Sequence, residues 1–241
     1  MDLGIDGKVA VVVAGSRGLG FATAQALAAE GARLVVSARG EDALASAASS
    51  LRAFGVDVAT VVADSADPDV PARLVSTAVE QFGGLDIVVA NAGGPPPGRS
   101  LEVTEAQLDS ALNLNLRSSI RLIQSSVPVL RQRGWGRICC ITSYSVVQPV
   151  PSLALSNTAR VGLWAWAKTA AQDLASDQSG ITLNLACPGP HATDRMKELG
   201  GSGVMGDPAD FGKIVAFLCS QPAAFVNGAA VVVDGGATLA L

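Results

Sequence analysis

The hydrophobic positions of this chain form short continuous runs that alternate with alanine-rich or amphipathic segments from one end to the other. Runs that are apolar on both faces, such as residues 9–13, are typical of strands buried inside a sheet. We therefore predict strands over 9–13, 33–38, 56–63, 85–90, 137–142, 181–186 and 229–233. The segments between them predict helices over 21–30, 41–54, 68–82, 104–130, 152–174 and 208–220, with Thr104 as the N-cap of the fourth.

Strands that alternate with helices predict parallel βαβ units with right-handed crossovers and helices on both faces of the sheet. No linker, repeat or charge block divides the 241 residues. We therefore expect a single doubly wound α/β domain of the Rossmann type over residues 1–241. In such a sheet the ligand lies at the carboxyl ends of the strands, so the residues that follow each strand are the candidate site residues.

The first predicted strand runs into a glycine-rich turn and then a helix, in the sequence KVAVVVAGSRGLG. Gly15, Gly18 and Gly20 allow a sharp turn and close packing, and the helix that begins near Leu19 presents free N–H groups above it. Such a helix start favours an anion, above all a phosphate. The alternative is a tight turn that binds nothing.

Arginines follow the first two strands where a dinucleotide site often carries an acid. Arg17 lies in the glycine turn and Arg39 after the second strand, with no acid before Glu41. Both side chains suit a 2′-phosphate and favour NADP(H) over NAD(H), unless they are merely solvated. Asp64 ends the third strand, where it would accept from an adenine amino group or cap the next helix.

Composition and charge exclude several other functions. The net charge of −4 and a pI near 5.0 argue against a nucleic-acid partner, and no run is long enough to span a membrane. Four cysteines without framework spacing indicate reduced thiols in the cytoplasm, with Cys139 and Cys140 on opposite faces of one strand. A single histidine and the absence of zinc-ligand spacing predict no metal site.

Several motifs fall in one order along the whole chain: GSRGLG, Asp64, the NAG of residues 91–93, Asn115, Ser143, the Pro-Gly of residues 188–189, Thr193 and a closing VDGG. This order resembles the short-chain dehydrogenase/reductases, and particularly divergent ketoacyl-acyl-carrier-protein reductases with a glycine- and proline-rich loop after NAG. The resemblance implies a sheet of about seven strands and hydride transfer to or from a carbonyl. It implies cofactor contacts from Gly15, Ser16, Arg17, Gly18, Leu19, Gly20, Arg39, Asp64, Asn91, Ala92, Gly93, Pro188, Gly189 and Thr193.

The resemblance also assigns an Asn, Ser, Tyr, Lys tetrad, and this chain departs from it. Asn115 takes the position that organises a water and Ser143 the one that orients the carbonyl, but Ser156 stands thirteen residues later in place of Tyr, and Arg160 in place of Lys. A serine hydroxyl is a poor acid, while an arginine keeps its charge to hold ribose hydroxyls and stays out of a proton relay.

Three other proton sources remain for such a site. The only tyrosine, Tyr144, follows Ser143, and the only histidine, His191, lies in the loop that the resemblance places at the nicotinamide. The third source is water. For both side chains, ordinary packing or a solvent-facing position is the alternative.

The glycine turn and the segment that would cover the substrate also depart from the family. Val13 and Ala14 stand where the family has Thr-Gly, so we expect a narrower approach to the phosphates. The lid segment, residues 194–205, is short and glycine-rich, with Gly200, Gly201 and Gly203. It predicts a cleft that is open or covered by a partner subunit.

Surplus apolar residues on the two long predicted helices, including Trp164 and Trp166, suggest a homodimer or homotetramer, unless they are ordinary core. The sequence as a whole predicts an NADP(H)-dependent oxidoreductase that acts on a small-molecule carbonyl or alcohol. The alternatives are a nucleotide-binding sensor, partner subunit or scaffold without redox turnover, and a non-redox lyase or isomerase that uses the same cleft.

Overall fold

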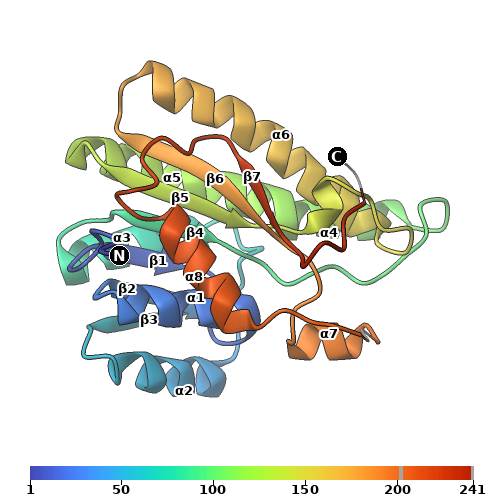
Figure 1. The fold of residues 1–241 in the computed structure, drawn as a ribbon, viewed down its shortest axis with the longest axis horizontal. Helices are drawn as coiled ribbons and strands as arrows, with labels where there is room; N and C mark the ends of the chain where they lie inside the picture. Colours follow the sequence, from blue (N-terminus) through green and yellow to red (C-terminus); the bar gives the residue numbers. More distant parts are fainter. Residues whose placement is uncertain (201–202, 240–241) are drawn as a thin grey trace.

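The computed structural model describes residues 1–200 and 203–239, and its strands form one parallel sheet (Figure 1). The seven strands lie in the order β3-β2-β1-β4-β5-β6-β7. Their bounds are β1 Val9–Val12, β2 Arg33–Ala38, β3 Val58–Val62, β4 Ile87–Ala90, β5 Gly136–Ile141, β6 Ile181–Pro188 and β7 Ala230–Val233. The predicted doubly wound α/β fold is confirmed, and the strand order reverses beside β1, between β2 and β4.

Helices connect these strands at nearly the predicted places. Their bounds are α1 Gly18–Ala29, α2 Glu41–Arg52, α3 Val70–Phe82, α4 Glu105–Leu112, α5 Ser118–Arg133, α6 Ala154–Ser176, α7 Asp194–Glu198 and α8 Pro208–Leu218. Two short elements join them, the π-helical segment η1 Asn113–Arg117 and the 3₁₀ turn η2 Tyr144–Val146. Neither the π-helical segment nor α7 was predicted, and the other boundaries differ from prediction by a few residues.

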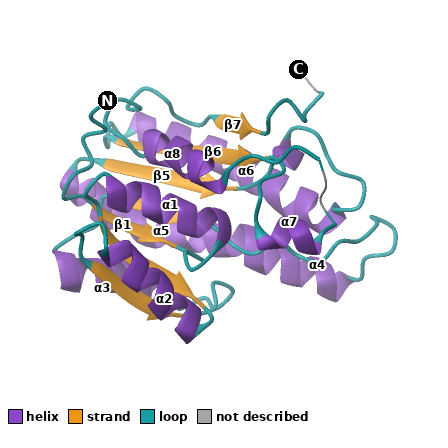
Figure 2. Cartoon of the chain, turned by 60° about the horizontal axis from the view of Figure 1, so that its bottom comes forward, coloured by secondary structure: helices purple, strands orange, loops and turns teal. Residues whose placement is uncertain are grey.

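Two hydrophobic cores hold the helices against the sheet. One core packs α1, α2 and α8 on one face, and the other packs α3, α5 and α6 on the opposite face (Figure 2). Cys140 belongs to the core under α5 and α6, whereas Cys139 belongs to the core under α1 and α8. Adjacent residues of a strand point to opposite faces, which confirms the prediction for this pair.

The fourth predicted helix is interrupted near its middle. Thr104 caps α4 with a capping box: its side chain accepts from the backbone N–H of Gln107, and the Gln107 side chain accepts from the backbone N–H of Thr104. Eight residues later the chain passes through η1 and continues as α5. A π-helical turn inserts one residue into the helical repeat and often marks a functional position. Here it contains Asn115.

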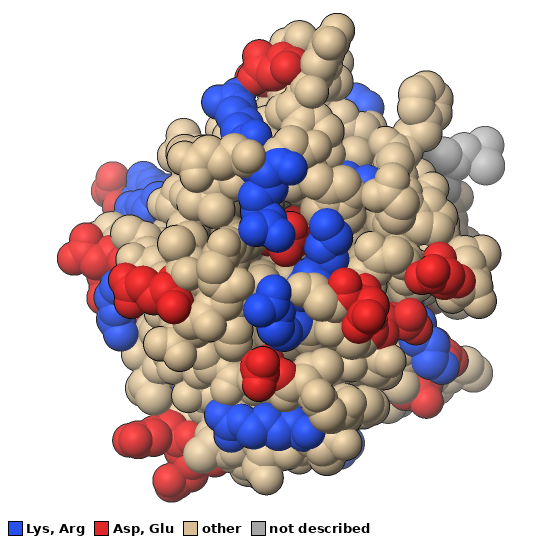
Figure 3. All heavy atoms as spheres, turned by 90° about the vertical axis from the view of Figure 1, so that its left-hand side faces the viewer, with Lys and Arg blue, Asp and Glu red and all other residues tan. Residues whose placement is uncertain are grey.

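The amino ends of the strands are tied together by a buried carboxylate. Asp86 is fully buried, and it accepts from the Val9 backbone N–H at 2.9 Å and from Arg133 Nε at 2.7 Å. The Trp135 ring lies between the Lys8 amino group and the Arg137 guanidinium, 4.2 and 4.5 Å from its centroid. Basic and acidic side chains are mixed on the side of the molecule shown in Figure 3.

The loops that follow the strands lie at the carboxyl ends of the strands, on the opposite side from Asp86. Within residues 1–200 and 203–239, no helix is long and apolar enough to cross a membrane. The same residues contain no group of three or more potential metal ligands.

Candidate functional site at the carboxyl edge of the sheet

The glycine turn after β1 is held in place by its neighbours and leaves the start of α1 open. The Gly15 N–H donates to the Ser37 carbonyl at 3.0 Å, and a Cβ at Gly15 would lie 2.7 Å from Val36. A Cβ at Gly20 would lie 2.6 Å from Asn91 Nδ2 and would overlap the Ala14 carbonyl. No side chain caps α1, so its first N–H groups remain available to an anion.

Ala14 adopts a backbone conformation that favours glycine. Its φ is +50°, in the left-handed region, and it stands where the family pattern has a glycine. The predicted departure at this position therefore has a structural consequence, because the turn keeps its shape and the alanine carries the strain.

The two arginines expected at a 2′-phosphate are both exposed and free. The side chains of Arg17 and Arg39 form no hydrogen bond or ion pair with any residue in the described ranges. The bond from Gly15 to Ser37 brings the glycine turn against the end of β2, so both arginines belong to one rim. Asp64 accepts from the Ala66 backbone N–H at 3.0 Å and thereby stabilises the turn after β3.

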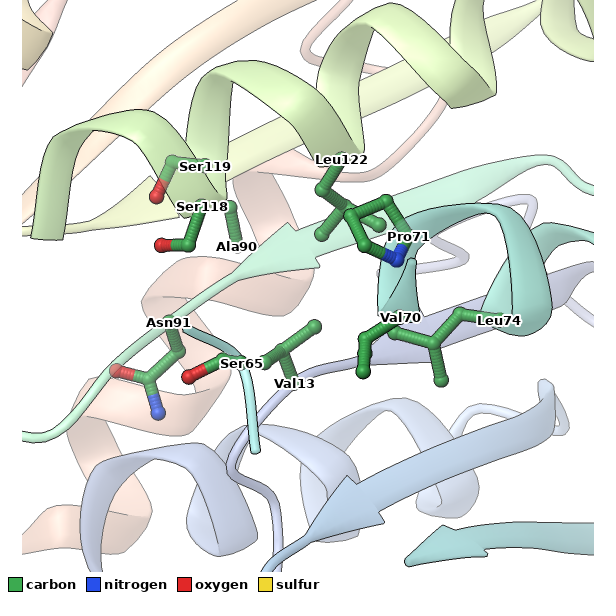
Figure 4. Close-up of a pocket in the computed structure, with 10 residues that line it drawn as sticks. All are labelled: Val13, Ser65, Val70, Pro71, Leu74, Ala90, Asn91, Ser118, Ser119 and Leu122. Atoms are coloured by element: carbon green, nitrogen blue, oxygen red, sulfur yellow. The ribbon is translucent and has the colours of Figure 1, made fainter. Parts of the chain in front are cut away.

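A small hollow, with room for about one water molecule, lies beside Asn91 at the carboxyl ends of β1 and β4 (Figure 4). Polar groups gather at one end, where Asn91 and Ser65 face Ser118 and Ser119 from α5, and the other end is apolar. Its full lining is Val13, Ser65, Val70, Pro71, Leu74, Ala90, Asn91, Ser118, Ser119 and Leu122. Of these, sequence reasoning singled out only Val13 and Asn91, because the serines become neighbours only through the fold.

The loop after β6 meets the glycine turn across the edge. Thr193 caps α7 through its hydroxyl and lies 3.8 Å from the position of a Cβ at Gly18. Gly189 donates to the Val233 carbonyl and packs against Asp234, which joins this loop to the closing VDGG motif. The motif residues predicted from both ends of the chain therefore lie along one edge. Ser16 and Leu19 lie in the glycine turn and the first turn of α1, Ala92 and Gly93 follow β4, and Pro188 ends β6.

Arg160 and Ser156 form a bonded pair at the end of β5. They lie one turn apart on α6 and are both buried, and Arg160 Nε donates to Ser156 Oγ at 3.1 Å. Arg160 Nη1 donates to the carbonyls of Ile141 and Thr142 at 3.2 and 2.9 Å. Ser143 is the next residue, and its hydroxyl accepts from the Ser145 N–H at 3.1 Å. The predicted replacements for Tyr and Lys therefore adjoin the predicted serine.

The electrostatics of Arg160 differ from the expectation of an ordinary guanidinium. Burial lowers its pKa to about 10; the thiol of Cys187 opposes this shift and the positive charge of Arg195 adds to it. The same buried surroundings raise the pKa of the Cys187 thiol to about 11. Arg160 is nevertheless charged at neutral pH.

Asn115 lies in the π-helical segment, and only one end of its side-chain amide is hydrogen-bonded. Its Nδ2 donates to the Ala111 carbonyl at 3.4 Å, while its buried Oδ1 has no partner among the described residues. Buried polar atoms without partners are uncommon and often mark the place of a water or ligand. This position agrees with an asparagine that holds a water.

His191 and Tyr144, the two candidate proton donors, occupy different surroundings. His191 is buried, its Nδ1 lies 3.0 Å from the Gly189 carbonyl, and its ring packs edge-on against Phe211 at 5.2 Å between centroids. The His191 ring therefore packs against α8 inside the fold. Tyr144 is half-buried at the start of η2, beside Ser143, and its hydroxyl bonds no other described residue.

The lid segment contains a short helix, α7, that sequence reasoning missed. Arg195 Nη2 donates to the Pro95 carbonyl at 2.8 Å, which ties α7 to the glycine- and proline-rich loop after β4. The expected open segment is therefore anchored at this point. Gly201, part of the predicted lid, lies outside the described residues. No sequence signal marked Arg195, because its partner is a backbone carbonyl 100 residues away.

Known proteins resemble this chain over nearly its whole length. A family model described as enoyl-(acyl carrier protein) reductase matches residues 13–238. The human dehydrogenase/reductase SDR family member 4 is 34% identical over 95% of this chain and 87% of its own length. An uncharacterized oxidoreductase of Mycobacterium tuberculosis is 33% identical over 97% of this chain and 93% of its own.

Solved structures resemble it equally closely. The L-sorbose reductase of Gluconobacter frateurii, complexed with NADPH and L-sorbose, superposes with a TM-score of 0.93 at 32% identity, over 100% of both chains. A 7α-hydroxysteroid dehydrogenase complexed with NADH and 7-oxo glycochenodeoxycholic acid gives a TM-score of 0.92 at 27% identity, over 98% of this chain and 96% of its own.

Proposed function

Because the chain belongs to the short-chain dehydrogenase/reductase family, we propose that it is an NADP(H)-dependent oxidoreductase that interconverts a carbonyl and an alcohol. The glycine turn with its two free arginines carries this proposal, since it offers open N–H groups and two unpaired positive charges at one edge. The loop after Asn91 favours the ketoacyl-reductase-like branch that the sequence resembles.

The residues of the carboxyl edge fit a dinucleotide. Gly18 and Gly20 leave room where a side chain would reach Thr193, Asn91 or the Ala14 carbonyl, and the α1 N-terminus favours the diphosphate. Arg17 and Arg39 would bind a 2′-phosphate through charge-assisted hydrogen bonds. Asp64, in the turn after β3, would accept a hydrogen bond from the adenine amino group. The L-sorbose reductase complex contains NADPH, which supports this assignment. The hydroxysteroid dehydrogenase complex contains NADH, so our choice between the two cofactors rests on Arg17 and Arg39.

In the proposed reaction, bound NADPH supplies a hydride to the carbonyl carbon, and the carbonyl oxygen takes a proton to give the alcohol. The hydroxyls of Ser143 and Ser156 would donate to the substrate oxygen, and the charge of Arg160 would stabilise negative charge that develops there. Arg160 Nη2 would also reach a ribose hydroxyl, and Asn115 Oδ1 would hold a water. The proton would come from Tyr144, from His191 or from water.

Two other functions follow from the same replacements. A serine hydroxyl at position 156 does not ionise as a phenol does, so hydride transfer loses its usual acid. The chain would then bind NADP(H) without turnover, as a sensor, partner subunit or scaffold. Alternatively, the site would run a lyase or isomerase reaction in which no hydride moves.

Association and location are part of the proposal. We infer a homodimer or homotetramer through α5 and α6. Trp164 and Trp166 are half-buried against the core, so part of their apolar surface is already used, but Val161 on α6 remains 38% exposed. The four cysteines are buried and unpaired, which supports the expected cytoplasmic location.

Isothermal titration with NADPH and NADH tests the cofactor. We expect the wild-type protein to bind NADPH at least tenfold more tightly, because a charge-assisted hydrogen bond contributes about 1.5–3 kcal/mol. Arg17→Gln with Arg39→Gln should bring the two affinities together by weakening NADPH alone. Equal affinities in the wild-type protein would contradict the choice of NADP(H).

Turnover is measured with the same protein by NADPH absorbance across ketones and aldehydes, and by alcohol oxidation with NADP⁺ at high pH. Consumption of NADPH with a carbonyl supports the oxidoreductase. Tight NADPH binding without any consumption points to the non-catalytic role. Products that form without an absorbance change point to the lyase or isomerase.

A further inference from the structure

Arg160 is a buried cation without a counter-charge. Its Nε and Nη1 are satisfied by Ser156 Oγ and by two carbonyls at the end of β5, but its Nη2 bonds no residue that the structure describes. Within residues 1–200 and 203–239, Arg160 also forms no ion pair. Carbonyl oxygens satisfy N–H donors, yet they leave the charge itself uncompensated, and a buried unpaired charge is costly.

The other buried arginine, Arg137, shows how the fold compensates a structural guanidinium. Arg137 also donates to backbone carbonyls, those of Gly136, Gly180 and Ser220. In addition its guanidinium lies 4.5 Å from the centre of the Trp135 ring, whose electron-rich face attracts a cation. No aromatic ring of the described residues lies against Arg160 in this way. The N–H groups on Nε and Nη1 of Arg160 therefore have hydrogen-bond partners, but no described residue compensates its positive charge.

Arg195 brings a second positive charge to the same place from the lid. Burial is the main cause of the lowered pKa of Arg160, and the positive charge of Arg195 lowers it slightly further. Arg195 is held by the Pro95 carbonyl, and its nearest acid, Glu198, is 3.6 Å away in an exposed pair. Exposed pairs of this kind contribute little. An anion bound beside Arg160 would compensate its buried charge and reduce the unfavourable effect of Arg195.

Two hydroxyl groups near Arg160 each still have an O–H to donate. The Ser143 hydroxyl accepts from Ser145 and the Ser156 hydroxyl accepts from Arg160, so each retains its own O–H to donate. With Nη2, they would match a ligand that presents two acceptor groups close together, a carbonyl oxygen and an anionic oxygen pair. The unused Nη2 of Arg160 suits a carboxylate oxygen through a charge-assisted hydrogen bond.

We propose that the substrate is a small oxo acid, whose carbonyl is held by Ser143 and Ser156 and whose carboxylate is bound by Arg160 and Arg195. This inference rests on the proposed function, since it names the substrate class of the same cleft. The two N–H groups of Nη2 suffice for a carboxylate oxygen and a ribose hydroxyl. The product of the reduction is the corresponding hydroxy acid.

Binding to the NADP⁺-loaded protein tests the proposal without turnover, because NADP⁺ has no hydride to give. The probes are pyruvate, acetoacetate and levulinate, each compared by calorimetry with its methyl ester, which keeps the carbonyl and removes the charge. At least one acid should bind ten or more times more tightly than its ester, and the three spacings show which length fits. Equal binding of acid and ester in all three pairs overturns the proposal.

Variants identify the residues responsible. Arg160→Met should bring the acid-to-ester affinity ratio close to one, and Arg195→Gln should reduce it severalfold. Arg73→Gln, an exposed arginine on α3, is the matched control and should leave the ratio unchanged. If circular dichroism shows that Arg160→Met does not fold, Arg195→Gln decides, and an unchanged ratio in that variant contradicts the proposal.

The outcomes separate this inference from the proposed function. Preferential acid binding with no NADPH consumption keeps the carboxylate site and rejects the oxidoreductase. NADPH consumption with neutral ketones and no preference for acids does the reverse. An Arg160→Met variant that weakens NADP⁺ binding but keeps the acid preference assigns the guanidinium to the ribose alone and rejects its role in binding the carboxylate.

Discussion

Ala14 is the residue of the glycine turn whose backbone is strained, because its side-chain methyl group disfavours the left-handed conformation. A left-handed backbone costs a residue other than glycine roughly 1 kcal/mol or more, yet the turn keeps this shape because Gly15 and Val13 are tied to Ser37 and Val89 on either side. The strain is therefore imposed by the neighbouring strands. Replacing the residue should release it without moving the turn.

Ala14→Gly should raise the free energy of unfolding by about 0.5–1 kcal/mol, since the relieved strain exceeds the greater backbone entropy of glycine. It should also tighten NADPH binding a few fold, because it removes the methyl group from the side of the diphosphate. Chemical denaturation and calorimetry measure the two effects.

Gln178→Gly is the matched control for this substitution. Gln178 has a φ of +51°, but it lies in the turn between α6 and β6, at the other end of the sheet. It should gain stability in the same way and leave NADPH affinity unchanged. Tighter NADPH binding in both variants, or in neither, would contradict the argument for Ala14.

Single residues also mark where sequence reasoning stops. The positions of Ser156 and Arg160 follow from counting along the chain. The bonds from Arg160 to the carbonyls of Ile141 and Thr142 do not, because these residues, at the end of β5, are nearly twenty residues away. His191 was a candidate acid on chemistry alone, and its contact with Phe211 of α8 is visible only once the chain has folded.

Elements were predicted well where one periodicity governs them. The apolar runs predicted all seven strands, and Thr104 as an N-cap predicted the start of α4, because both signals depend on residues near in sequence. The π-helical segment at Asn113–Arg117 and the helix α7 were missed. A single inserted residue barely alters a helical pattern, and α7 is fixed by the bond from Arg195 to Pro95.

Helix α6 sets the geometry in which a tyrosine and a lysine would work. Ser156 and Arg160 lie four residues apart, so their side chains are on one face of the helix. Ser156→Tyr with Arg160→Lys should raise kcat/KM for NADPH-dependent carbonyl reduction by about a hundredfold, the lower end of what a positioned general acid contributes. Steady-state kinetics at neutral pH measures it.

Thr158→Tyr with Arg160→Lys is the control for register. Thr158 is exposed on the other side of α6, so its phenol would not reach the cleft. This variant should show no gain. A gain in both variants, or an unchanged rate in the Ser156→Tyr variant when its fold is intact, would mean that α6 does not present position 156 to the substrate.

The two ends of the sheet have separate tasks in the molecule as a whole. At the amino ends, Asp86 and Trp135 tie several elements together with their partners satisfied. At the carboxyl ends, Arg17, Arg39 and Asn115 Oδ1 remain without partners in the part of the chain that the structure describes. These three polar groups at the carboxyl ends of the strands are available to a ligand.

Association through α5 and α6 would leave this edge accessible. Val161 is the exposed apolar residue of α6, one position after buried Arg160, and a partner helix would cover it. We expect light scattering to give a mass of at least twice 24.3 kDa for the wild-type protein. A charge buried in such an interface is costly, so Val161→Glu should shift the protein toward the monomer.

Val62→Glu distinguishes the interface from a general effect of charge. Val62 is 46% exposed at the end of β3, on the far edge of the sheet from α6, and its substitution should leave the mass unchanged. A monomeric wild-type protein would refute association altogether. An oligomer that resists Val161→Glu would move the interface away from α6, and with it the idea that a second subunit lies behind the helix that carries Ser156 and Arg160.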